Sequence, residues 1–569
     1  MEIVMNKDQL HERRDFRDVR ELVEWAASNY GEKIAYSYKP DPHKSEAVSA
    51  SFEELLDDVR ALGSELLSMG CAGKHCVVIG KFSYDWVRMY FALLSIGAVL
   101  VPLDRDWLKD DLADTASKAD ASFLFCDEDI AEKADHIAEQ VKLEAPVVYM
   151  LAKTHERSLE SLVVAGREKY AADPSAFAEA EIDPEGMSLL VFTSGTTGKG
   201  KGVMLSQKNV LSDLSAVIPY IDFADKTVGV LPPHHTYGSS VMMIGHAMIG
   251  CEIYISAGLR YIQKELKDQK PGHLVIVPLY LETFYRKIKA NIKDRGMEKK
   301  IELAIKLSNG LRKVGVDIRH KLFAEVLEAF GGNVKMAISG GAPINPEVLA
   351  FFDAIGISAL NGYGITECAP IVAVNRSKNV VPGSVGTILD IDEVKIANPN
   401  EDGEGEICVK GDNVMLGYYK DELATAEAFD SEGYFKTGDY GKLDKNNVLY
   451  ITGRKKNLII LSNGKNVYPE EIENELAATP GVLDIIVYEG QSRRGLEHNA
   501  IVAEIYPDQD FIDKNGITDV KAHIKPYIDA YNKTAVPYKK IGVLKIRKTE
   551  FPKNTLRKIL RFKIDMTID

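Results

Sequence analysis

The sequence predicts an α/β protein: a large N-terminal domain of layered α/β subdomains with a β-rich subdomain, then a small α+β domain. Three observations support this prediction. Apolar runs typical of strands alternate with amphipathic stretches through the first 400 residues, as in layered α/β structures. After about residue 380, short apolar segments are separated by Gly and Asp, which predicts β-strands and tight turns. From about residue 457 a compact pattern of helix and strand follows.

The first 400 residues contain a succession of predicted helices and strands. The stretch 51–70, SFEELLDDVRALGSELLSMG, has the apolar spacing of a helix and leads into the strand-like 74–82. A second helix-like stretch, 84–96, leads into the strand-like 98–103. Residues 281–330 have amphipathic helical patterns. Further strand-like segments are 187–192, 226–233, 252–256, 273–278 and 334–339.

The last third of the chain has shorter elements. Residues 383–411, GSVGTILDIDEVKIANPNEDGEGEICVKG, predict the β-rich subdomain because apolar positions alternate between Gly and Asp turns. In the last domain the clearest predicted helix is 468–479, YPEEIENELAAT. The sequence GRKKN, residues 453–457, follows the strand-like VLYIT and is the candidate linker between the two parts.

Charge and composition exclude some classes of function. The chain has 70 Lys and Arg against 84 Asp and Glu, a net charge of −14, which argues against general nucleic-acid binding. Residues 521–569 are different, because they hold 13 Lys and Arg against 4 Asp and Glu. This basic segment is either a solvated face or a surface that attracts a polyanionic ligand or an acidic membrane.

Nothing in the sequence predicts export or a membrane span. The N-terminus is charged from the start, and the longest apolar run, 90–103, is too short to cross a bilayer. The six cysteines are scattered without a CxxC pair, as expected for reduced thiols in a cytoplasmic protein. We therefore expect a cytoplasmic chain, monomeric or homodimeric, with no transmembrane segment; peripheral membrane contact stays open.

The glycine-rich stretch TSGTTGKGKG, residues 193–202, has most of the phosphate loop pattern GxxxxGK[ST]. Gly202 stands where that pattern has a Mg²⁺-binding Ser or Thr, and an apolar strand-like run follows instead of a helix. The stretch therefore predicts a hairpin loop that cradles phosphate through amides, hydroxyls and ammonium groups. A true phosphate loop that opens a helix and a plain glycine-rich turn are the alternatives.

Five further motifs follow this loop in order: YGITE (363–367), GYFKTGD (433–439), GRKKNLI (453–459), LSNGKNVYPEEIE (461–473) and FPKNTLRKILR (551–561). With these motifs the chain resembles the adenylate-forming superfamily, which includes acyl-CoA synthetases, peptide-synthetase adenylation domains and luciferases. The resemblance extends from roughly residue 20 to residue 563, as the ordered motifs indicate. It implies an AMP-binding domain, residues 1–455, and a mobile C-terminal domain, residues 456–569, with a hinge at Lys456.

The resemblance also implies a two-step reaction. A carboxylate attacks the α-phosphate of ATP and releases pyrophosphate, and a thiol of CoA then displaces AMP from the acyl-adenylate. Because both reactants of the first step are anions, positive charge and Mg²⁺ are needed at the α-phosphorus. The loop residues expected to hold phosphate are Thr193, Ser194, Gly195, Thr196, Thr197, Gly198 and Lys201.

Other residues receive roles by the same resemblance. Thr366 is expected at the α-phosphate, Glu367 at Mg²⁺ together with Thr196, and Lys558 between the carboxylate and the α-phosphate. Lys553 is the alternative to Lys558, because Arg557 replaces the Gly that usually precedes the catalytic lysine. The residues expected around adenosine are Gly341, Ala342, Pro343, Gly362, Tyr363, Asp439 and Arg454, and those expected near CoA are Gly464 and Lys465.

His235, in LPPHHTYGSS, occupies the position that gates the acid site in the family. Peptide-synthetase domains generally have Asp here, so His235 argues against an amino-acid substrate. Met242 and Met243 follow among small residues, which fits an apolar channel and fits a packed core helix equally well. We expect a medium-chain or long-chain fatty acid, with transfer to a carrier-protein thiol as the alternative to CoA. Gly200 replaces a frequent Pro and is expected to loosen the phosphate loop.

Overall fold

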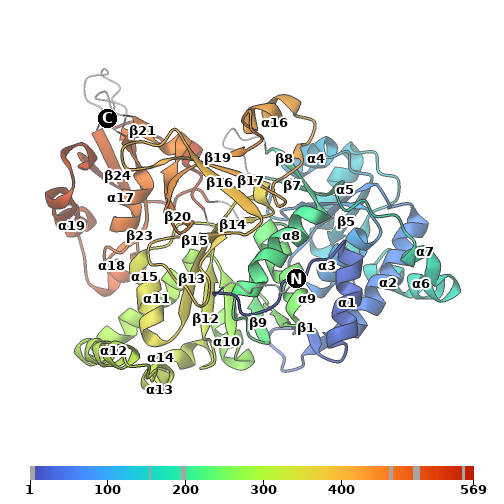
Figure 1. Cartoon of the computed structure of the whole chain (residues 1–569), viewed down its shortest axis with the longest axis horizontal. Coiled ribbons are helices and arrows are strands. Elements are labelled where there is room, and N and C mark those ends of the chain that lie inside the picture. The colour runs from blue at the N-terminus through green and yellow to red at the C-terminus, as the bar shows by residue number, and fades with distance from the viewer. Residues whose placement is uncertain are drawn as a thin grey trace.

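A computed structural model of the 569-residue chain describes residues 7–152, 156–193, 200–460, 466–490, 500–553 and 558–568. Figure 1 shows a large α/β body built from the first 450 residues and a smaller unit, in orange and red, that carries the C-terminus. The α/β class predicted for the chain is confirmed.

A seven-stranded sheet forms the centre of the N-terminal region, in the order β18-β8-β7-β4-β3-β5-β6. Strands β3 to β7 run parallel to their neighbours, whereas β7 and β8 form an antiparallel hairpin. The predicted strands at 74–82, 98–103 and 187–192 are confirmed. The strands are β3 (His75–Ile79), β4 (Val99–Leu103), β5 (Phe123–Asp127), β6 (Val148–Met150), β7 (Met187–Phe192), β8 (Gly202–Ser206) and β18 (Gly417–Tyr418).

Helices pack on this sheet: α1 (Val19–Tyr30), α2 (Phe52–Met69), α3 (Tyr84–Ser95), α4 (Lys109–Lys118), α5 (Ala131–Gln140), α6 (Leu159–Ala172), α7 (Pro174–Ala178) and α8 (Gln207–Val217). Local signals set the ends of α2, which confirms the helix expected at 51–70. Ser51 and Glu54 form a capping box at its start, and Gly70 ends it with a φ of 84°.

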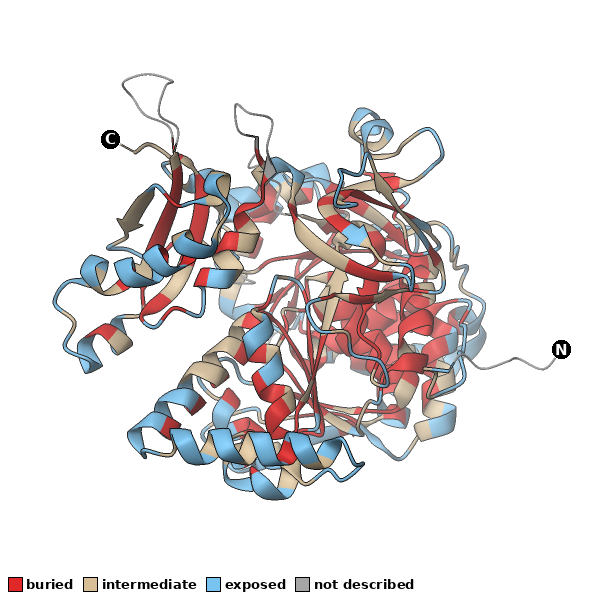
Figure 2. Ribbon diagram, turned by 60° about the vertical axis from the view of Figure 1, so that its left-hand side comes forward, coloured by how far each residue is buried: buried red, intermediate tan, exposed pale blue. Residues whose placement is uncertain are grey.

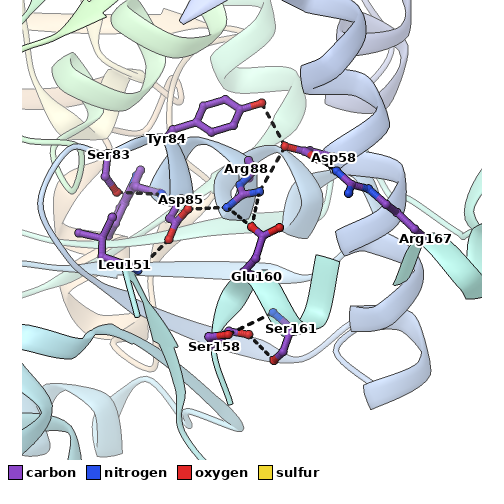
Figure 3. A network of polar contacts seen from close by, with 11 residues as sticks. Asp58, Ser83, Tyr84, Asp85, Arg88, Leu151, Ser158, Glu160, Ser161 and Arg167 are labelled. Carbon is purple, nitrogen blue, oxygen red and sulfur yellow. Dashed lines mark hydrogen bonds and ion pairs between the residues drawn. The ribbon is translucent and has the colours of Figure 1, made fainter. Parts of the chain in front are cut away.

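A buried ion network ties three of these helices together (Figure 3). Arg88 of α3 lies 3.3 Å from Asp58 of α2 and 3.3 Å from Glu160 of α6, and it also pairs with Asp85. The Arg88 side chain is 8% exposed, so removing the guanidinium would leave the carboxylates of Asp58 and Asp85 with less compensation in a buried site, which costs about 3–5 kcal/mol. The network therefore fixes the register of α2, α3 and α6 against one another.

A second, four-stranded sheet has the order β2-β1-β10-β9. A nine-residue π-helix, η3 (Tyr237–Gly245), continues into α9 (His246–Ile249) between β9 and β10. The strands expected at 226–233 and 252–256 are confirmed, whereas β1 and β2 lie where no strand was predicted. The elements are β1 (Ile34–Tyr38), β2 (Val48–Ser51), β9 (Lys226–Gly229), β10 (Glu252–Ile255) and α10 (Ile262–Gln269).

The third sheet has nine strands in the order β11-β12-β13-β14-β15-β20-β19-β17-β16. Strands β11 to β13 are parallel, and from β13 onward the pairs are antiparallel. The predicted β-rich region is therefore continuous with the parallel strands through β13 and β14. The strands are β11 (His273–Ile276), β12 (Met336–Ser339), β13 (Ser358–Gly364), β14 (Ile371–Val374), β15 (Gly386–Ile388), β16 (Asp392–Ala397), β17 (Gly405–Gly411), β19 (Phe435–Leu443) and β20 (Val448–Arg454).

Residues 281–330 are helical, as their amphipathic pattern predicted. Helices α12 (Glu298–Arg312), α13 (Arg319–Leu322) and α14 (Ala324–Leu327) lie at the lower edge of the molecule in Figure 1, and α11 (Pro278–Asp294) and α15 (Pro346–Ile355) lie above them. Helix α16 (Glu422–Ala428) is separate and lies at the top of the same view.

The C-terminal unit has its own core. Its two hydrophobic clusters contain only residues from Ile459 onward, packed around the three-stranded sheet β23-β24-β25. The proposed linker begins inside β20 and continues as the 3₁₀ turn η6 (Lys455–Asn457). The elements are β21 (Ile459–Ile460), β22 (Asn466–Val467), α17 (Pro469–Leu476), β23 (Val482–Gly490), β24 (Ala500–Pro507), α18 (Gln509–Lys514), α19 (Val520–Thr534) and β25 (Val543–Ile546).

All six cysteines are buried and free. Among the described residues, no helix has both the length and the apolar character needed to cross a bilayer. The red segments of Figure 2 show that burial is concentrated in the sheets and in the helices against them.

Candidate active site

The predicted phosphate loop lies at the turn between β7 and β8. Thr193 and Lys201 flank the turn, and the Thr193 amide donates a hydrogen bond of 3.1 Å to the Lys201 carbonyl. Because the chain returns as an antiparallel strand, the alternative of a phosphate loop that opens a helix is wrong. The helix that follows, α8, begins only at Gln207, and its N-cap is Ser206. The predicted residues Ser194, Gly195, Thr196, Thr197 and Gly198 lie outside the described residues.

The presence of glycine at position 200 has a steric explanation in this structure. A Cβ added at this position would lie 2.5 Å from the carbonyl oxygen of Thr193, which is closer than real Cβ atoms come to a backbone oxygen. The absence of a side chain therefore permits the two ends of the hairpin loop to approach closely.

A chain of contacts links this hairpin to Glu367. The Nζ atom of Lys201 lies 4.3 Å from the centre of the Tyr418 ring, and the Tyr418 hydroxyl donates a 3.0 Å hydrogen bond to Glu367 Oε1. Tyr418 belongs to β18, which pairs with β8. Burial and the Glu367 carboxylate raise the pKa of Tyr418, so it stays a hydrogen-bond donor. No local pattern indicated Tyr418, because it lies more than 200 residues from its strand partner Val203.

Thr366 and Glu367 lie in a short 3₁₀ turn, Thr366–Cys368, directly after β13. Glu367 is half-buried, and among the described residues its Oε2 atom accepts no hydrogen bond. A carboxylate oxygen that is free beside a phosphate loop is a suitable ligand for Mg²⁺, which prefers hard oxygen donors. The donor set at Glu367 therefore fits the expected metal ion.

Asp439, Arg454 and Tyr363 form the most tightly connected part of the site. Asp439 and Arg454 are cross-strand partners on β19 and β20, and Arg454 Nε lies 2.8 Å from Asp439 Oδ1. The Tyr363 hydroxyl, from β13, donates a 2.7 Å hydrogen bond to Asp439 Oδ2. Asp439 is 3% exposed and raises the pKa of Arg454. Both carboxylate oxygens are thus oriented, and each keeps a lone pair for a ligand hydroxyl.

The other predicted adenosine residues lie on β13 and after its neighbour β12. Gly362 is on β13 directly before Tyr363, and Gly341, Ala342 and Pro343 form a loop after β12. Gly341 has a φ of 82°, a left-handed conformation that favours glycine, and a Cβ added there would touch only Val277. The loop can therefore present its backbone at the ends of the parallel strands, where ligands of open α/β sheets generally bind.

Lys558, near the C-terminus, interacts electrostatically with this cluster. Its pKa is lowered to about 8, first by the positive charge of Arg454 and second by desolvation, while Asp439 and Glu470 oppose the shift. Lys558 nevertheless stays exposed to solvent. The structure thus places a cation that is partly deprotonated near pH 8 within electrostatic reach of Asp439 and Arg454.

The alternative lysine, Lys553, is engaged elsewhere. Its Nζ atom lies 2.7 Å from Asp484 and 2.8 Å from Glu550, and its side chain is 8% exposed. Lys553 and Ile559 form an antiparallel bridge that brackets the segment before Lys558. Lys553 is therefore held by two carboxylates, and Lys558 is the residue of the two whose charge interacts with Asp439 and Arg454.

Lys456 lies in η6, directly after the last strand of the nine-stranded sheet. Its pKa is lowered, first by burial and second by the positive charge of Arg454. Next to it, Lys455 pairs with Glu406 of β17 at 2.6 Å, and Asn457 donates a hydrogen bond to Glu470 of α17. The predicted hinge therefore lies between one anchor on each side. Gly464 and Lys465, the residues expected near CoA, lie outside the described residues.

His235 and its neighbour His234 are neutral at pH 7. Burial lowers the pKa of His235 to about 3 and that of His234 to about 4. His234 Nε2 lies 3.5 Å from Asp104 Oδ2, and the two imidazole rings are 4.5 Å apart. Neither imidazole thus carries a charge at the expected acid-gating position, and the nearby carboxylate is that of Asp104. Met242 and Met243 follow in the same segment and are fully buried in the main core, which favours the packed-helix alternative.

One buried group has the composition of a metal site. Ligand atoms of His246, Cys251 and His273 lie within 4.8 Å of one another, and no other such group occurs in the described ranges. His273 Nδ1 accepts a hydrogen bond from the Ala224 amide, so its proton is on Nε2, which donates to His246 Nε2 at 2.9 Å. His246 Nδ1 then donates to the Val241 carbonyl. These hydrogen bonds account for all four nitrogens and leave none for a metal ion.

Comparison with known proteins adds an independent observation. Residues 23–419 match the family described as AMP-binding enzyme. The chain is 29% identical to the rat long-chain-fatty-acid–CoA ligase 5 over 545 residues, which cover 88% of this chain and 78% of the relative. It is also 29% identical to the long-chain-fatty-acid–CoA ligase FadD15 of Mycobacterium bovis, over 76% of this chain and 74% of the relative.

Solved structures show the same fold. ATP-bound MatB from Rhodopseudomonas palustris superposes with a TM-score of 0.73 at 22% identity, covering 96% of this chain and 97% of that one. The anthranilate CoA ligase AuaEII in complex with anthranoyl-AMP gives a TM-score of 0.75 at 18% identity, with 98% of each chain covered. At this identity the likeness establishes the architecture alone.

Proposed function

Because the chain belongs to the AMP-binding enzyme family, we propose that it is an ATP-dependent acid–CoA ligase that forms AMP. The observation that carries the proposal is the electrostatic interaction of Lys558 with Asp439 and Arg454, which are themselves paired with each other. Lys558 belongs to the C-terminal unit, whereas Asp439 and Arg454 belong to strands of the nine-stranded sheet. The reaction joins two anions, a carboxylate and ATP, so it requires positive charge where they meet. Lys558 and Arg454 supply that charge beside the oriented Asp439 carboxylate.

In the first half-reaction a carboxylate oxygen of the acid attacks the α-phosphorus of ATP, and the bond to the leaving pyrophosphate breaks. Asp439 accepts hydrogen bonds from the ribose hydroxyls, held in place by Arg454 and Tyr363. Lys558 and Thr366 lie at the α-phosphate and offset the negative charge that gathers there. Mg²⁺, when bound at Glu367, supplies further positive charge to the phosphate oxygens. The hairpin loop after Thr193 holds the leaving pyrophosphate through its amides and hydroxyls.

In the second half-reaction the sulfur of CoA attacks the acyl carbonyl, and AMP leaves with the bonding electron pair. Lys558 has no role in this step, so the C-terminal unit is free to turn about Lys456 and bring Gly464 and Lys465 to the thiol. The anchors at Lys455 and Asn457 confine the rotation to the few bonds between them.

The acid that we propose is a medium-chain or long-chain fatty acid. The relatives named above are long-chain-fatty-acid–CoA ligases, and they match most of this chain. His235 is neutral, and it stands where peptide-synthetase domains have the Asp that pairs with an α-ammonium group, so His235 itself supplies no anion for an amino-acid substrate. An uncharged acyl chain is the class of substrate that such a site accepts without leaving a buried charge unpaired.

The experiment is a pyrophosphate-release assay with fatty acids from C2 to C20, in the presence and absence of CoA. We expect acid-dependent pyrophosphate in both cases, thioester only with CoA, and the highest kcat/KM for a medium or long chain. Pyrophosphate without any thioester would instead support transfer to a carrier-protein thiol. ADP and phosphate as the products would contradict both versions of the proposal.

A further inference from the structure

Helix α12 and the turn after it expose large apolar side chains. Leu303 is 68% exposed, Leu307 is 56% exposed, and Val314 and Val316 in the turn are 73% and 46% exposed. A single exposed leucine is ordinary in a folded protein, but four large apolar side chains within 14 residues form a contiguous patch. We call this set of four residues the α12 patch.

Helix geometry places the two leucines of the α12 patch on one side, because Leu303 and Leu307 are four residues apart in α12. Val314 and Val316 lie beyond the C-cap residue Lys313, in the turn that follows the helix. The opposite face packs against the protein, where Ile301 and Ile305 contact the hydrophobic cluster of α11 and α15. The inner face therefore holds the helix against the protein. Packing within the chain does not explain why the outer face carries exposed leucines.

The surroundings of the α12 patch are strongly basic. Residues 286–321 contain 12 Lys and Arg against 4 Asp and Glu, a net charge of +8 in a chain whose net charge is −14. Lys299, Lys300 and Lys313 are exposed and, within the part of the chain that the structure describes, form no ion pair. Long lysine side chains next to exposed leucines are typical of helices that lie in a membrane interface.

The position of the helix permits such contact. α12 lies at the lower edge of the molecule in Figure 1, away from the phosphate hairpin, and Figure 2 shows its outward surface exposed. The tip of the turn, Val314 to Val316, has Gly315 at a φ of 82°, which lets the chain reverse and present both valines. A flat surface can therefore reach the patch without a clash with the body of the protein.

We propose that the α12 patch docks this protein onto an anionic lipid surface, with the leucines and valines inserted at the headgroup level and the lysines on the phosphates. Charge complementarity decides between this occupant and a second copy of the chain. A symmetric dimer through α12 would place one +8 region against another, and the repulsion would oppose it. The proposal concerns attachment, so it does not depend on the acid or thiol assigned above.

The test measures vesicle binding by sedimentation with phosphatidylcholine vesicles containing 0% or 30% phosphatidylglycerol. We expect binding only with phosphatidylglycerol, and weaker binding when the salt is raised from about 0.05 to 0.5 M, because the Debye length shortens. Replacing three lysines in K299Q/K300Q/K313Q should lower the partition coefficient roughly 100-fold. L303S/L307S should lower it about tenfold or more through lost apolar burial.

Matched controls change equally exposed residues elsewhere. L108S/L423S removes two leucines that are 73% and 72% exposed, and K442Q/K445Q/K548Q removes three exposed lysines. Both controls should bind like the wild type, and all variants should keep the wild-type Tm. Failure of the wild type to bind anionic vesicles, or equal loss in patch and control variants, would overturn the proposal. Self-association that L303S/L307S abolishes, without vesicle binding, would assign the patch to a second copy.

Discussion

The large α/β part and the C-terminal unit contribute to the site in different ways. Tyr363, Asp439 and Arg454 sit on three strands of one nine-stranded sheet, so their positions follow from the hydrogen bonds of that sheet. Lys558 stands on a loop of a separately packed unit, which contacts the large part through pairs such as Lys514 with Asp294. In the proposed mechanism the groups that bind the nucleotide are thus fixed in one sheet, and the charge that acts in only one step is on the unit that we expect to turn.

The largest effect should come from removing that movable charge. In Lys558→Ala the rate of acyl-adenylate formation should fall about 10²–10³-fold, as it does when one electrostatic group is lost from a reacting centre. Thioester formation from supplied acyl-adenylate should change less than about threefold, since Lys558 does not act there. Lys563→Ala, an exposed lysine of the same segment, is the control. An equal loss in both half-reactions would show that the substitution disturbs the folded protein in general and not adenylation in particular.

A second substitution tests whether the two parts must move. In Lys456→Pro the proline ring fixes φ, while no hydrogen bond of the Lys456 amide is lost among the described residues. Adenylation should continue, and thioester formation should fall about 10-fold to 100-fold, a rough expectation for a blocked conformational step. Lys456→Ala, which removes the side chain and keeps the free rotation, should behave nearly as the wild type. If the proline variant kept its rate of thioester formation, the hinge would have to lie at another residue.

The two parts should also respond to pH with opposite signs. Burial lowers the pKa of His246 in the large part to about 4, below the unfolded value of about 6.5, so protonation favours unfolding. Stability of that region should therefore fall as the pH drops from 6.5 toward 4. Burial raises the pKa of Glu473 in the C-terminal unit to about 7, so its contribution is present at low pH and is lost as the pH rises through 7.

Peptide-resolved hydrogen exchange at pH 5 and pH 7, corrected for intrinsic rates, measures this contrast. Each group contributes at most about 1.4 kcal/mol per pH unit to the opening free energy. We expect peptides of β9 to β11 to gain protection toward pH 7, and peptides of β23 and β24 to lose it. His246→Gln should reduce the slope of the first set and leave the second unchanged. Parallel slopes in both regions would contradict the assignment.

The smallest effect concerns the titration of Lys558 itself. Its pKa of about 8 predicts that kcat/KM for adenylation is constant at neutral pH and falls above about 8, as the ammonium loses its proton. Glu470 raises this pKa, so Glu470→Gln should move the alkaline limb to lower pH and reduce the rate a few-fold at pH 8. Glu475→Gln, a nearby acidic residue of α17, is the control. A limb that stays in place would show that another group titrates.

Much of the fold followed from local patterns. The capping box at Ser51 and Glu54, the apolar runs of β3, β4 and β7, and the strand-like residues after Gly202 all act within a few positions in the chain. For this reason the hairpin at the phosphate loop could be predicted from the residues that follow it. The strands β5 and β6 are as apolar as their neighbours, but short runs of this kind do not distinguish a strand from a buried helix.

Residues of the site could be predicted only where they belong to a recognisable sequence motif. Thr366, Glu367, Asp439 and Lys558 were expected by resemblance, whereas the link from Lys201 through Tyr418 to Glu367 was missed. That link depends on β18 pairing with β8, a contact across the sheet that no local pattern encodes. The burial that makes His235 neutral was missed for the same reason, because it is set by segments distant in sequence.

The pairing of β8 with β18 has a consequence during synthesis of the chain. At about 5–20 residues per second, a ribosome needs roughly 10–40 s to travel from Ser206 to Gly417. During that interval β8 is the unpaired edge of a nearly complete sheet, and its apolar side chains and open amides can pair with another nascent chain. The synthesis of β18, which covers the open edge of β8, therefore ends the period in which that edge can pair with another chain.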